Sequence, residues 1–233
     1  MFRIGILGAA DIAFNKFIPA LMKVEGTECA GVASNSPDKL KRFVEKYNVH
    51  VYSSYNEVIG DDSVDCVYIP LPPAFHYEWA KKALLAGKHV FLEKPSTTSA
   101  DDTKELVGIA GEKGLVVQEN YMFQFHAQLK EIENLIASGE LGKLRLVRTS
   151  FGFPRRAEGD FRYVKELGGG TMMDNGGYTI KLIDMLLGES MRLVSSQLDY
   201  DEKTGIDIFG TAEFVNDDGV IAQAAFGMDC QYQ

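Results

Sequence analysis

The first half of the chain alternates short apolar runs with stretches of helical periodicity. Apolar runs bounded by turn residues are typical of buried strands, whereas Phe14, Phe17, Ile18 and Leu21 repeat at helical spacing. We expect strands at 3–7, 29–33, 64–69, 89–92 and 115–117, and helices at 12–24, 37–47, 77–86 and 101–113. Because the expected strands read as buried on both faces and alternate with helices, the pattern predicts an α/β fold with a doubly wound parallel sheet.

Residues at the expected helix ends support these boundaries. Pro37 occupies a position favoured in the first turn of a helix, and Ser99 is a suitable N-cap. Gly87 and Gly114 follow the last periodic residues of two helices, where glycine commonly ends a helix. The local chemistry therefore agrees with the hydrophobic pattern.

The pattern changes after about residue 120. The expected elements are a helix at 127–138 ending in Gly139, a strand at 144–151, a polar loop at 154–165, a helix at 171–187, and strands at 193–200, 206–215 and 220–226. Asp217-Asp218-Gly219 predicts a hairpin between the last two strands. We therefore expect a Rossmann-type domain at 1–120 and an α+β domain with an open, mostly antiparallel sheet at 121–233.

The chain ends just after the last expected strand. A three-stranded antiparallel sheet is a small structure on which to finish a domain, so we expect the second domain to be truncated and its sheet incomplete at the C-terminus. Either another chain completes the sheet, which predicts a homo-oligomer formed through it, or the sequence is a fragment of a longer protein.

Composition and charge narrow the class of partner. Of 233 residues, 45% are hydrophobic and 24% charged, as in ordinary globular proteins. The formal net charge of -9 argues against nucleic acid as the main partner, because the average surface repels phosphate backbones. No apolar run reaches the roughly 18 residues of a membrane helix, and Met1 leads directly into a strand. We expect a cytoplasmic protein without membrane contact.

Cysteine and histidine usage adds little chemistry. Cys29, Cys66 and Cys230 are odd in number, far apart and embedded in apolar runs, so we expect buried, reduced thiols. The four histidines show no metal-ligand spacing, and we expect no metal site.

The first turn has the context of a dinucleotide-binding fingerprint. Gly8, Ala10 and Ala13 place small residues between a strand and a helix, where the backbone must turn tightly and approach a pyrophosphate. Ala10 replaces the usual middle glycine. The alternative is an ordinary Gly-Ala turn. We interpret Gly8, Ala10, Asp11 and Ile12 as cofactor contacts.

The end of the second strand favours NADP over NAD. An NAD enzyme usually has an acidic residue here for the ribose hydroxyls, but no acid occurs before Asp38. Ser34, Asn35 and Lys39, followed by Lys41 and Arg42, suit a 2'-phosphate better. The alternative is that these cations form the solvated face of a helix.

Unusual residues follow the other strands of the expected parallel sheet. Ligands bind outside the carboxyl ends of such strands. The candidate cofactor contacts there are Pro70, Leu71, Pro72, His76, Glu93, Lys94 and Gln118, and the candidate substrate contacts are Asn120 and Tyr121. Lys94 is a candidate acid or electrostatic group, the alternative being a surface lysine. Pro95 restrains Lys94 to an extended backbone and is a candidate for a cis peptide.

A third cluster lies in the second half, at 167–178. Asp174 and Tyr178 are four residues apart, so one helix face presents both. Gly176 and Gly177 each cost a helix about 1 kcal/mol relative to Ala, which predicts close approach to a ligand or another backbone. A cation near the Tyr178 hydroxyl would make it a useful acid, and Lys94 is our candidate for that cation. The alternative is a packed tyrosine with a helix-surface aspartate.

Together these clusters resemble the glucose–fructose oxidoreductase/inositol dehydrogenase/rhizopine catabolism family of NAD(P)-dependent oxidoreductases. The family's Gly-rich first turn matches 8–13, its Glu-Lys-Pro motif matches 93–95, and its triple glycine followed by Asp and then His or Tyr matches 168–178. Many members have His where this chain has Tyr178. The Tyr form is similar to glucose–fructose oxidoreductase, dihydrodiol and xylose dehydrogenases, and nucleotide-sugar 3-ketoreductases. The first turn and Phe161-Arg162 most resemble the 3-ketoreductases.

The resemblance implies hydride transfer between a nicotinamide and a hydroxyl or keto carbon of a sugar or nucleotide sugar. Lys94, Tyr178 and Asp174 are then the expected catalytic residues, with Tyr178 exchanging the proton. Asn175 joins the expected substrate contacts, and Arg162 the expected cofactor contacts. The alternatives are a non-catalytic NADP-binding or sugar-sensing protein on the same fold and, with less support, a protein that binds another nucleotide such as a methyl donor. The latter gives the Lys-Pro segment no role.

Overall fold

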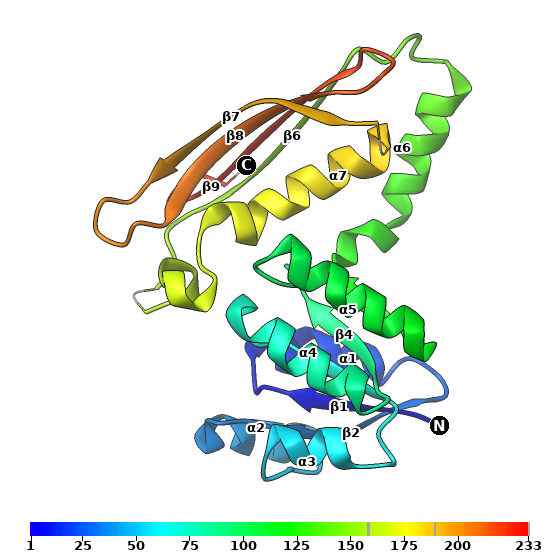
Figure 1. The fold of residues 1–233 in the computed structure, drawn as a ribbon, viewed down its shortest axis with the longest axis vertical. Helices are drawn as coiled ribbons and strands as arrows, with labels where there is room; N and C mark the ends of the chain where they lie inside the picture. The colour runs from blue at the N-terminus through cyan, green and yellow to red at the C-terminus, as the bar shows by residue number, and fades with distance from the viewer. Residues whose placement is uncertain (158, 189, 233) are drawn as a thin grey trace. The chain divides into compact units, whose positions relative to one another are not determined.

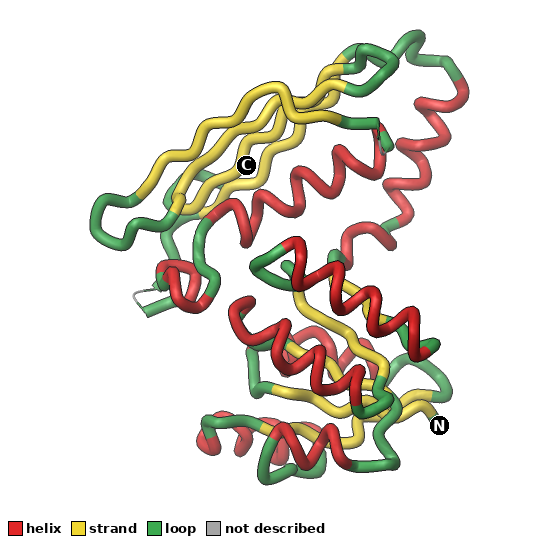
Figure 2. Tube along the Cα trace, viewed as in Figure 1, coloured by secondary structure: helices red, strands yellow, loops and turns green. Residues whose placement is uncertain are grey.

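The computed structural model describes residues 1–157, 159–188 and 190–232. It divides into two compact units, Met1–Asn120 and Tyr121–Gln233 (Figures 1 and 2). Each unit has its own hydrophobic core, so each is described by itself.

The first unit is built on a five-stranded parallel sheet. Its strand order is β2-β1-β3-β4-β5, and every neighbouring pair is parallel. The strands are β1 (Phe2–Leu7), β2 (Thr27–Ala33), β3 (Cys66–Ile69), β4 (His89–Glu93) and β5 (Val117–Asn120). Because the chain crosses from β2 to β3 past β1, the order reverses beside β1. Ligands of doubly wound sheets bind at such a switch point.

Helices cover both faces of this sheet (Figure 1). One face packs against the π-helical turn η1 (Ala13–Phe17), α1 (Ile18–Leu21) and α2 (Pro37–Tyr47). The other packs against α3 (Tyr55–Gly60), α4 (His76–Leu85), which follows the short η2 (Pro73–Phe75), and α5 (Ala100–Lys113). The predicted doubly wound sheet is confirmed, with a core on each side.

The predicted caps agree with the structure, but three elements differ from expectation. Pro37 begins α2, Ser99 Oγ accepts from the Asp102 amide, and Gly114 ends α5 in the left-handed region. The expected helix 12–24 opens with a π-helical turn, and α3 had not been predicted. The last strand begins at Val117, because the Leu115 amide instead bonds Ala110 O at 2.8 Å and closes α5.

The second unit is an α+β fold on a four-stranded sheet of order β6-β9-β8-β7. Its strands are β6 (Leu146–Phe153), β7 (Arg192–Tyr200), β8 (Asp207–Val215) and β9 (Ile221–Met228). The last three pair antiparallel, whereas β6 pairs parallel to β9. The predicted mostly antiparallel sheet and its last hairpin are therefore confirmed.

One long helix, α7 (Gly177–Leu187), packs on a face of that sheet (Figure 1). Ile183 and Leu187 meet Phe214, Ala222 and other apolar side chains of β8 and β9. The remaining elements are η3 (Met122–Phe125), α6 (Ala127–Ser138), η4 (Phe161–Tyr163), η5 (Lys165–Leu167) and the π-helical turn η6 (Met172–Gly176). The turn η6 continues directly into α7, which places Asp174 and Tyr178 at the start of the covering helix.

The cysteine prediction is correct for one thiol of three. All are free and Cys66 is buried, but Cys29 and Cys230 are only partly buried. Cys29 lies on β2 at the edge of its sheet, and Cys230 lies just beyond β9, so neither is covered on all sides. Burial raises the pKa of the Cys66 thiol to about 12 and that of Cys29 to about 11, which keeps both protonated.

Among the described residues, no helix is long and apolar enough to cross a bilayer.

Candidate functional site

Gly8 turns the chain tightly between β1 and η1. Its φ of +123° is in a region that L side chains rarely adopt, and its amide donates to Ala33 O at 2.9 Å. A Cβ added here would lie 2.8 Å from Leu71 Cδ2. The structure therefore brings two predicted cofactor contacts, Gly8 and Leu71, to one place at the carboxyl edge of the sheet.

The residues after Gly8 form an open backbone cradle. The first helical bond of this segment runs from Phe14 N to Ala10 O at 3.1 Å, so the amides just before Phe14 have no helical acceptor. Amides in this position suit a phosphate group. Ala10 and Ile12 are partly buried and Asp11 is exposed. The cradle, which depends on a glycine, fits the pyrophosphate of a dinucleotide.

Arg42 ties α2 to this turn. Its Nη1 lies 2.6 Å from Asp11 Oδ1, its Nη2 donates to Ala9 O at 3.3 Å, and its guanidinium carbon lies 4.7 Å from the centre of the Phe14 ring. The charges of Arg42 and Asp11 offset each other. The role of Asp11 in the structure is thus to hold the turn, and its predicted cofactor contact stays a prediction.

The three cations proposed for a 2'-phosphate differ in their surroundings. Arg42 pairs with Asp11, and Lys41 lies 3.7 Å from Glu45. Lys39 is exposed and makes no ion pair within the described ranges. Ser34 Oγ accepts from the Ser36 amide at 3.0 Å, which shapes the turn after β2. Ser34 and Lys39 are therefore the stronger candidates.

His76 bridges the two loops that follow β3 and β4. Its ring is fully buried, with Nε2 2.7 Å from Leu71 O and Nδ1 2.8 Å from Pro95 O. Burial lowers the pKa of His76, although the two carbonyls and Glu93 oppose this. The neutral ring carries one N–H, so it donates to one of these carbonyls. His76 fixes the loop that carries Lys94, and the Lys94–Pro95 peptide is cis.

Glu93 is the centre of a buried polar group in the first unit. Its Oε1 accepts from the Tyr68 hydroxyl at 2.6 Å and from Asn120 Nδ2 at 2.7 Å. Gln118 Nε2 donates to Glu119 O at 2.8 Å. Glu93 and Asn120, predicted to contact cofactor and substrate respectively, thus contact each other. Burial and the neighbouring carboxylate raise the pKa of Tyr68, which keeps this unpredicted donor protonated.

In the second unit, Tyr178 lies in a cluster of aromatic rings. The ring centres of Tyr121, Phe151 and Phe123 lie 5.0, 5.3 and 5.7 Å from that of Tyr178. Two of these contacts are edge-on, a favourable geometry for aromatic pairs. The cluster holds the Tyr178 ring from three sides. Tyr121 and Phe123 lie close together in the sequence, but the sequence pattern did not predict this cluster.

Two glycines make room for aromatic rings at the start of α7. A Cβ on Gly177 would overlap the Tyr121 hydroxyl oxygen, and a Cβ on Gly176 would lie 3.2 Å from the Phe226 ring. The expectation that these glycines approach another backbone is therefore wrong, because the atoms nearest to both are side chains of the same unit. The expected approach to a ligand stays a prediction. The sequence showed that these glycines lower the stability of the helix, but it did not show which side chains lie next to them.

Replacing Gly177 by alanine should lower activity although alanine favours the helix by about 1 kcal/mol. The added methyl group displaces the Tyr121 ring, and with it the packing of Tyr178. Gly177→Ala combined with Tyr121→Phe removes the overlapping oxygen and should recover part of the loss, since the next ring atom is 3.2 Å away. Steady-state turnover of both variants is the measurement, with Gly108→Ala in α5, where a Cβ meets nothing, as the control. Unchanged turnover in Gly177→Ala would contradict this account.

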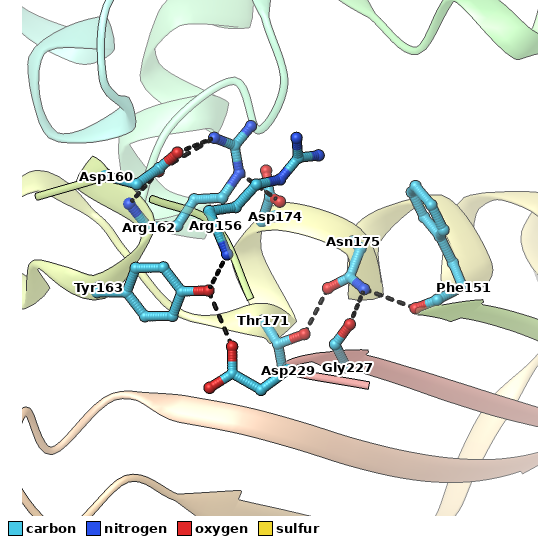
Figure 3. Close-up of polar contacts among 10 residues, drawn as sticks. All are labelled: Phe151, Arg156, Asp160, Arg162, Tyr163, Thr171, Asp174, Asn175, Gly227 and Asp229. Carbon is cyan, nitrogen blue, oxygen red and sulfur yellow. Dashed lines mark hydrogen bonds and ion pairs between the residues drawn. The ribbon is translucent and has the colours of Figure 1, made fainter. Parts of the chain in front are cut away.

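Asp174 is buried rather than on the helix surface. Its Oδ2 accepts from Arg162 Nε at 2.7 Å, and the same guanidinium also contacts Asp160 (Figure 3). The alternative of a helix-surface aspartate is wrong. The structure also gives Arg162, predicted to contact the cofactor, two carboxylate partners within its own unit.

Asn175 joins η6 to the sheet. Its Nδ2 donates to Phe151 O at 2.6 Å and to Gly227 O at 2.9 Å, and its Oδ1 accepts from the Thr171 hydroxyl (Figure 3). A side-chain amide has two N–H donors, and both are used by carbonyls of β6 and β9. In this structure both donors of Asn175 therefore hold the sheet, and its predicted substrate contact stays a prediction. Over the described ranges, no group of three or more His, Cys, Asp or Glu could hold a metal ion.

The comparisons with known proteins cover both units. The "Oxidoreductase family, NAD-binding Rossmann fold" matches residues 2–121, and the "GFO/IDH/MocA C-terminal domain" matches residues 129–233. A dTDP-3,4-didehydro-2,6-dideoxy-alpha-D-glucose 3-reductase from Streptomyces violaceoruber is 40% identical over 99% of this chain and 68% of its own length. The D-xylose 1-dehydrogenase (NADP(+)) 2 of Haloferax volcanii is 33% identical over 97% of this chain and 69% of its own.

Solved structures agree with these matches. A 3-ketoreductase from Actinomadura kijaniata, crystallised with NADP and TDP-benzene, superposes with a TM-score of 0.96 at 37% identity, covering 99% of this chain and 71% of that chain. With both family domains matched along nearly the whole chain, this protein belongs to the GFO/IDH/MocA family of oxidoreductases with an NAD-binding Rossmann fold.

Proposed function

We propose that this protein is an NADPH-dependent reductase of a keto carbon in a nucleotide-linked sugar. The observation that supports this most is the 40% identity, over 99% of the chain, to a dTDP-sugar 3-reductase. A relative of known structure binds NADP and TDP-benzene. The local geometry agrees, since one unit has a backbone cradle at Gly8 and the other holds Tyr178 and Asp174 in fixed surroundings.

The residues at the carboxyl edge of the parallel sheet would hold the dinucleotide. The amides that follow Gly8 would bind the pyrophosphate, with Ala10 and Ile12 beside it. Ser34 and Lys39 would bind the 2'-phosphate, and the loop from Pro70 to Pro72 would line the site. His76 would keep that loop and the Lys94 loop at a fixed distance, because it contacts a carbonyl of each.

Reduction adds a hydride to the keto carbon and a proton to its oxygen. NADPH, when bound, supplies the hydride and becomes NADP⁺. Tyr178 would donate its hydroxyl proton to the substrate oxygen, and the ammonium group of Lys94 would stabilise negative charge developing on that oxygen. Asp174 can only accept hydrogen bonds as a carboxylate, so it would orient a donor group. The aromatic cluster fixes the Tyr178 ring for this transfer.

A second candidate is oxidation of a free sugar with NADP⁺, favoured by the similarity to a D-xylose 1-dehydrogenase (NADP(+)). The two candidates differ in substrate and direction. Absorbance of NADPH followed with a dTDP-linked 3-keto sugar, and separately with NADP⁺ and D-xylose, distinguishes them. Turnover in the first assay alone supports our proposal, and turnover in the second alone supports the alternative. Cofactor binding without turnover of any sugar would indicate a non-catalytic protein.

Ser34→Asp should reverse the preference between the two cofactors. We expect the native protein to bind NADPH more tightly than NADH, because no acidic residue lies between the end of β2 and Asp38 and because Lys39 is exposed. A carboxylate at position 34 repels the 2'-phosphate and accepts bonds from ribose hydroxyls instead. Fluorescence titration of both cofactors measures the effect, with Ser63→Asp, on a distant turn of the same unit, as control. Tighter NADH binding by the native protein would contradict the proposal.

Cytoplasmic location and homo-oligomer formation through the sheet of the second unit stay predictions. The face of that sheet opposite α7 includes Arg148, Ser195, Thr211, Glu213 and Gln223, which line a hollow there. Sedimentation velocity on the protein at two concentrations measures its oligomeric state.

A further inference from the structure

Arg162 is a partly buried arginine of the second unit that contacts two carboxylates. Its Nε donates to Asp174 Oδ2 at 2.7 Å, and its Nη1 lies 3.1 and 3.3 Å from the two carboxylate oxygens of Asp160 (Figure 3). The Arg162 and Asp174 side chains are only 23% and 10% exposed. Although burial opposes the charge, the two carboxylates hold the pKa of Arg162 above its ordinary value. The Arg162 guanidinium therefore forms ion pairs with two carboxylates, those of Asp174 and Asp160.

The backbone of Arg162 is fixed from both sides. The Asp160 carboxylate accepts from the Arg162 amide at 3.0 Å and caps η4. The Arg162 carbonyl accepts from the Gly170 amide at 2.9 Å. A Cβ on Gly169 would lie 2.5 Å from that carbonyl oxygen, so a larger residue does not fit there.

The same glycine segment positions Asp174. Asp174 lies one helical turn after Gly170, and its amide donates to the Gly170 carbonyl oxygen at 3.1 Å. The triple glycine is thus the connection that folds the chain back against Arg162 and then begins the turn carrying Asp174. Within this glycine segment, Gly169 lies against the backbone of Arg162. The wide π-helical turn lets Asp174 reach Arg162 while Asn175 reaches the carbonyls of β6 and β9.

We propose that Arg162 is a positioning residue of the reaction, which holds Asp174 ionised and in one orientation, with Asp160 as its anchor. The proposal rests on the function proposed above, in which Asp174 orients the substrate. A carboxylate held in this way only accepts hydrogen bonds. Asp174 therefore selects a donor, such as a substrate hydroxyl or an ammonium group, and disfavours a keto oxygen at the position that it contacts.

A purely structural ion pair would share part of this behaviour. Removing one partner of a buried pair leaves an unpaired charge and destabilises the fold. Loss of stability in an Arg162 variant therefore does not distinguish the two roles. The pH dependence does, because without the guanidinium the buried Asp174 carboxylate ionises less readily. Activity that depends on ionised Asp174 should then require a higher pH.

The experiment compares kcat/KM from pH 5 to 9 in full-chain variants, with NADPH saturating and a dTDP-linked 3-keto sugar as substrate. In the native protein kcat/KM should fall at acidic pH as Asp174 becomes protonated. For Arg162→Met we expect this fall, the acidic limb of the pH profile, to move to a pH higher by about one unit or more, which is at least a tenfold loss of kcat/KM at the acidic end. Arg162→Lys keeps the cation and should restore the limb, with a lower kcat because one amine cannot reproduce the guanidinium geometry. Asp174→Asn should lose activity, and the remaining activity should lack this acidic fall because the titrating carboxylate is gone.

Arg156→Met is the matched control. Arg156 lies in the same loop with its guanidinium over the Phe153 ring, and it makes no ion pair with any described residue. Its pH profile should stay that of the native protein. If Arg162→Met does not fold, Arg162→Gln supplies a second neutral variant with some hydrogen-bonding capacity.

Two outcomes separate this inference from the proposed function. If Asp174→Asn is inactive and the neutral Arg162 variants keep the native pH profile, the positioning role is wrong and the proposed function stands. If Asp174→Asn is as active as the native protein, the proposed function of Asp174 itself fails. NADPH affinity should stay within about threefold in the Asp174 and Arg156 variants, a difference below 1 kcal/mol.

Discussion

Replacing Tyr178 by phenylalanine should lower turnover by about a hundred- to ten-thousandfold, the range that a positioned acid usually contributes. Phenylalanine removes the proton that the substrate oxygen needs but keeps the ring. Because Tyr121, Phe123 and Phe151 pack against that ring, the surroundings of the site should stay intact. Folding and NADPH affinity should therefore change little, and kcat should fall far more than KM rises.

The measurement is single-turnover NADPH oxidation with a dTDP-linked 3-keto sugar. Tyr163→Phe is the matched control, since this hydroxyl in the same unit donates to Asp229 and accepts from the Arg156 amide. It should cost stability but little turnover. If Tyr178→Phe keeps most of the native rate while NADPH and substrate bind normally, another group carries the proton.

The first unit was the more predictable part of the fold, for a physical reason. Its first four strands consist mostly of buried residues and read as apolar runs in the sequence. The edge strand β5 has the sequence Val-Gln-Glu-Asn and is only partly buried, so its position was predicted less well. The helix α3 escaped prediction because it is only one or two turns long and has little periodicity. Its N-terminus was nevertheless encoded, since Ser54 accepts from the Glu57 amide and Glu57 accepts from the Ser53 amide, a capping arrangement.

The sequence pattern indicated the candidate clusters but gave less information on the contacts within them. Gly8 was predicted from the turn that it must form, and the structure adds Leu71 as the side chain that requires it. The π-helical turns at 13–17 and 172–176 were not predictable, because the spacing of apolar residues is too coarse to show one extra residue. Both occur at candidate sites, where such turns are frequent.

Contacts between residues far apart in sequence were the hardest to anticipate. Asp174 and Arg162 are 12 residues apart and meet only because the triple glycine folds the chain back. Asn175 reaches Gly227, which is 52 residues away. A helical wheel shows which residues share a face, but it does not show what that face meets. For this reason Asp174 was open to interpretation as a surface residue, and the contacts of Asn175 with the sheet were not predicted.

Lys94→Met should also lower turnover by about a hundred- to ten-thousandfold, because it removes the charge that would stabilise the substrate oxygen. Methionine keeps an unbranched stem, and the loop should keep its place because His76 contacts the Pro95 carbonyl. Lys94→Arg keeps the charge with a different shape, so it should recover only part of the rate. Lys104→Met, at an exposed position of α5, is the control.

The double variant with Tyr178→Phe then tests whether the two side chains act on one step. Residues that work as a unit are strongly non-additive, so the double variant should lose little more than the worse single variant. Single-turnover rates of the native protein, both single variants and the double variant close the cycle, with NADPH saturating throughout. If the two losses multiply instead, each side chain contributes independently. Proton donation by Tyr178 would then not depend on the charge of Lys94, and the coupled role proposed for the pair would be wrong.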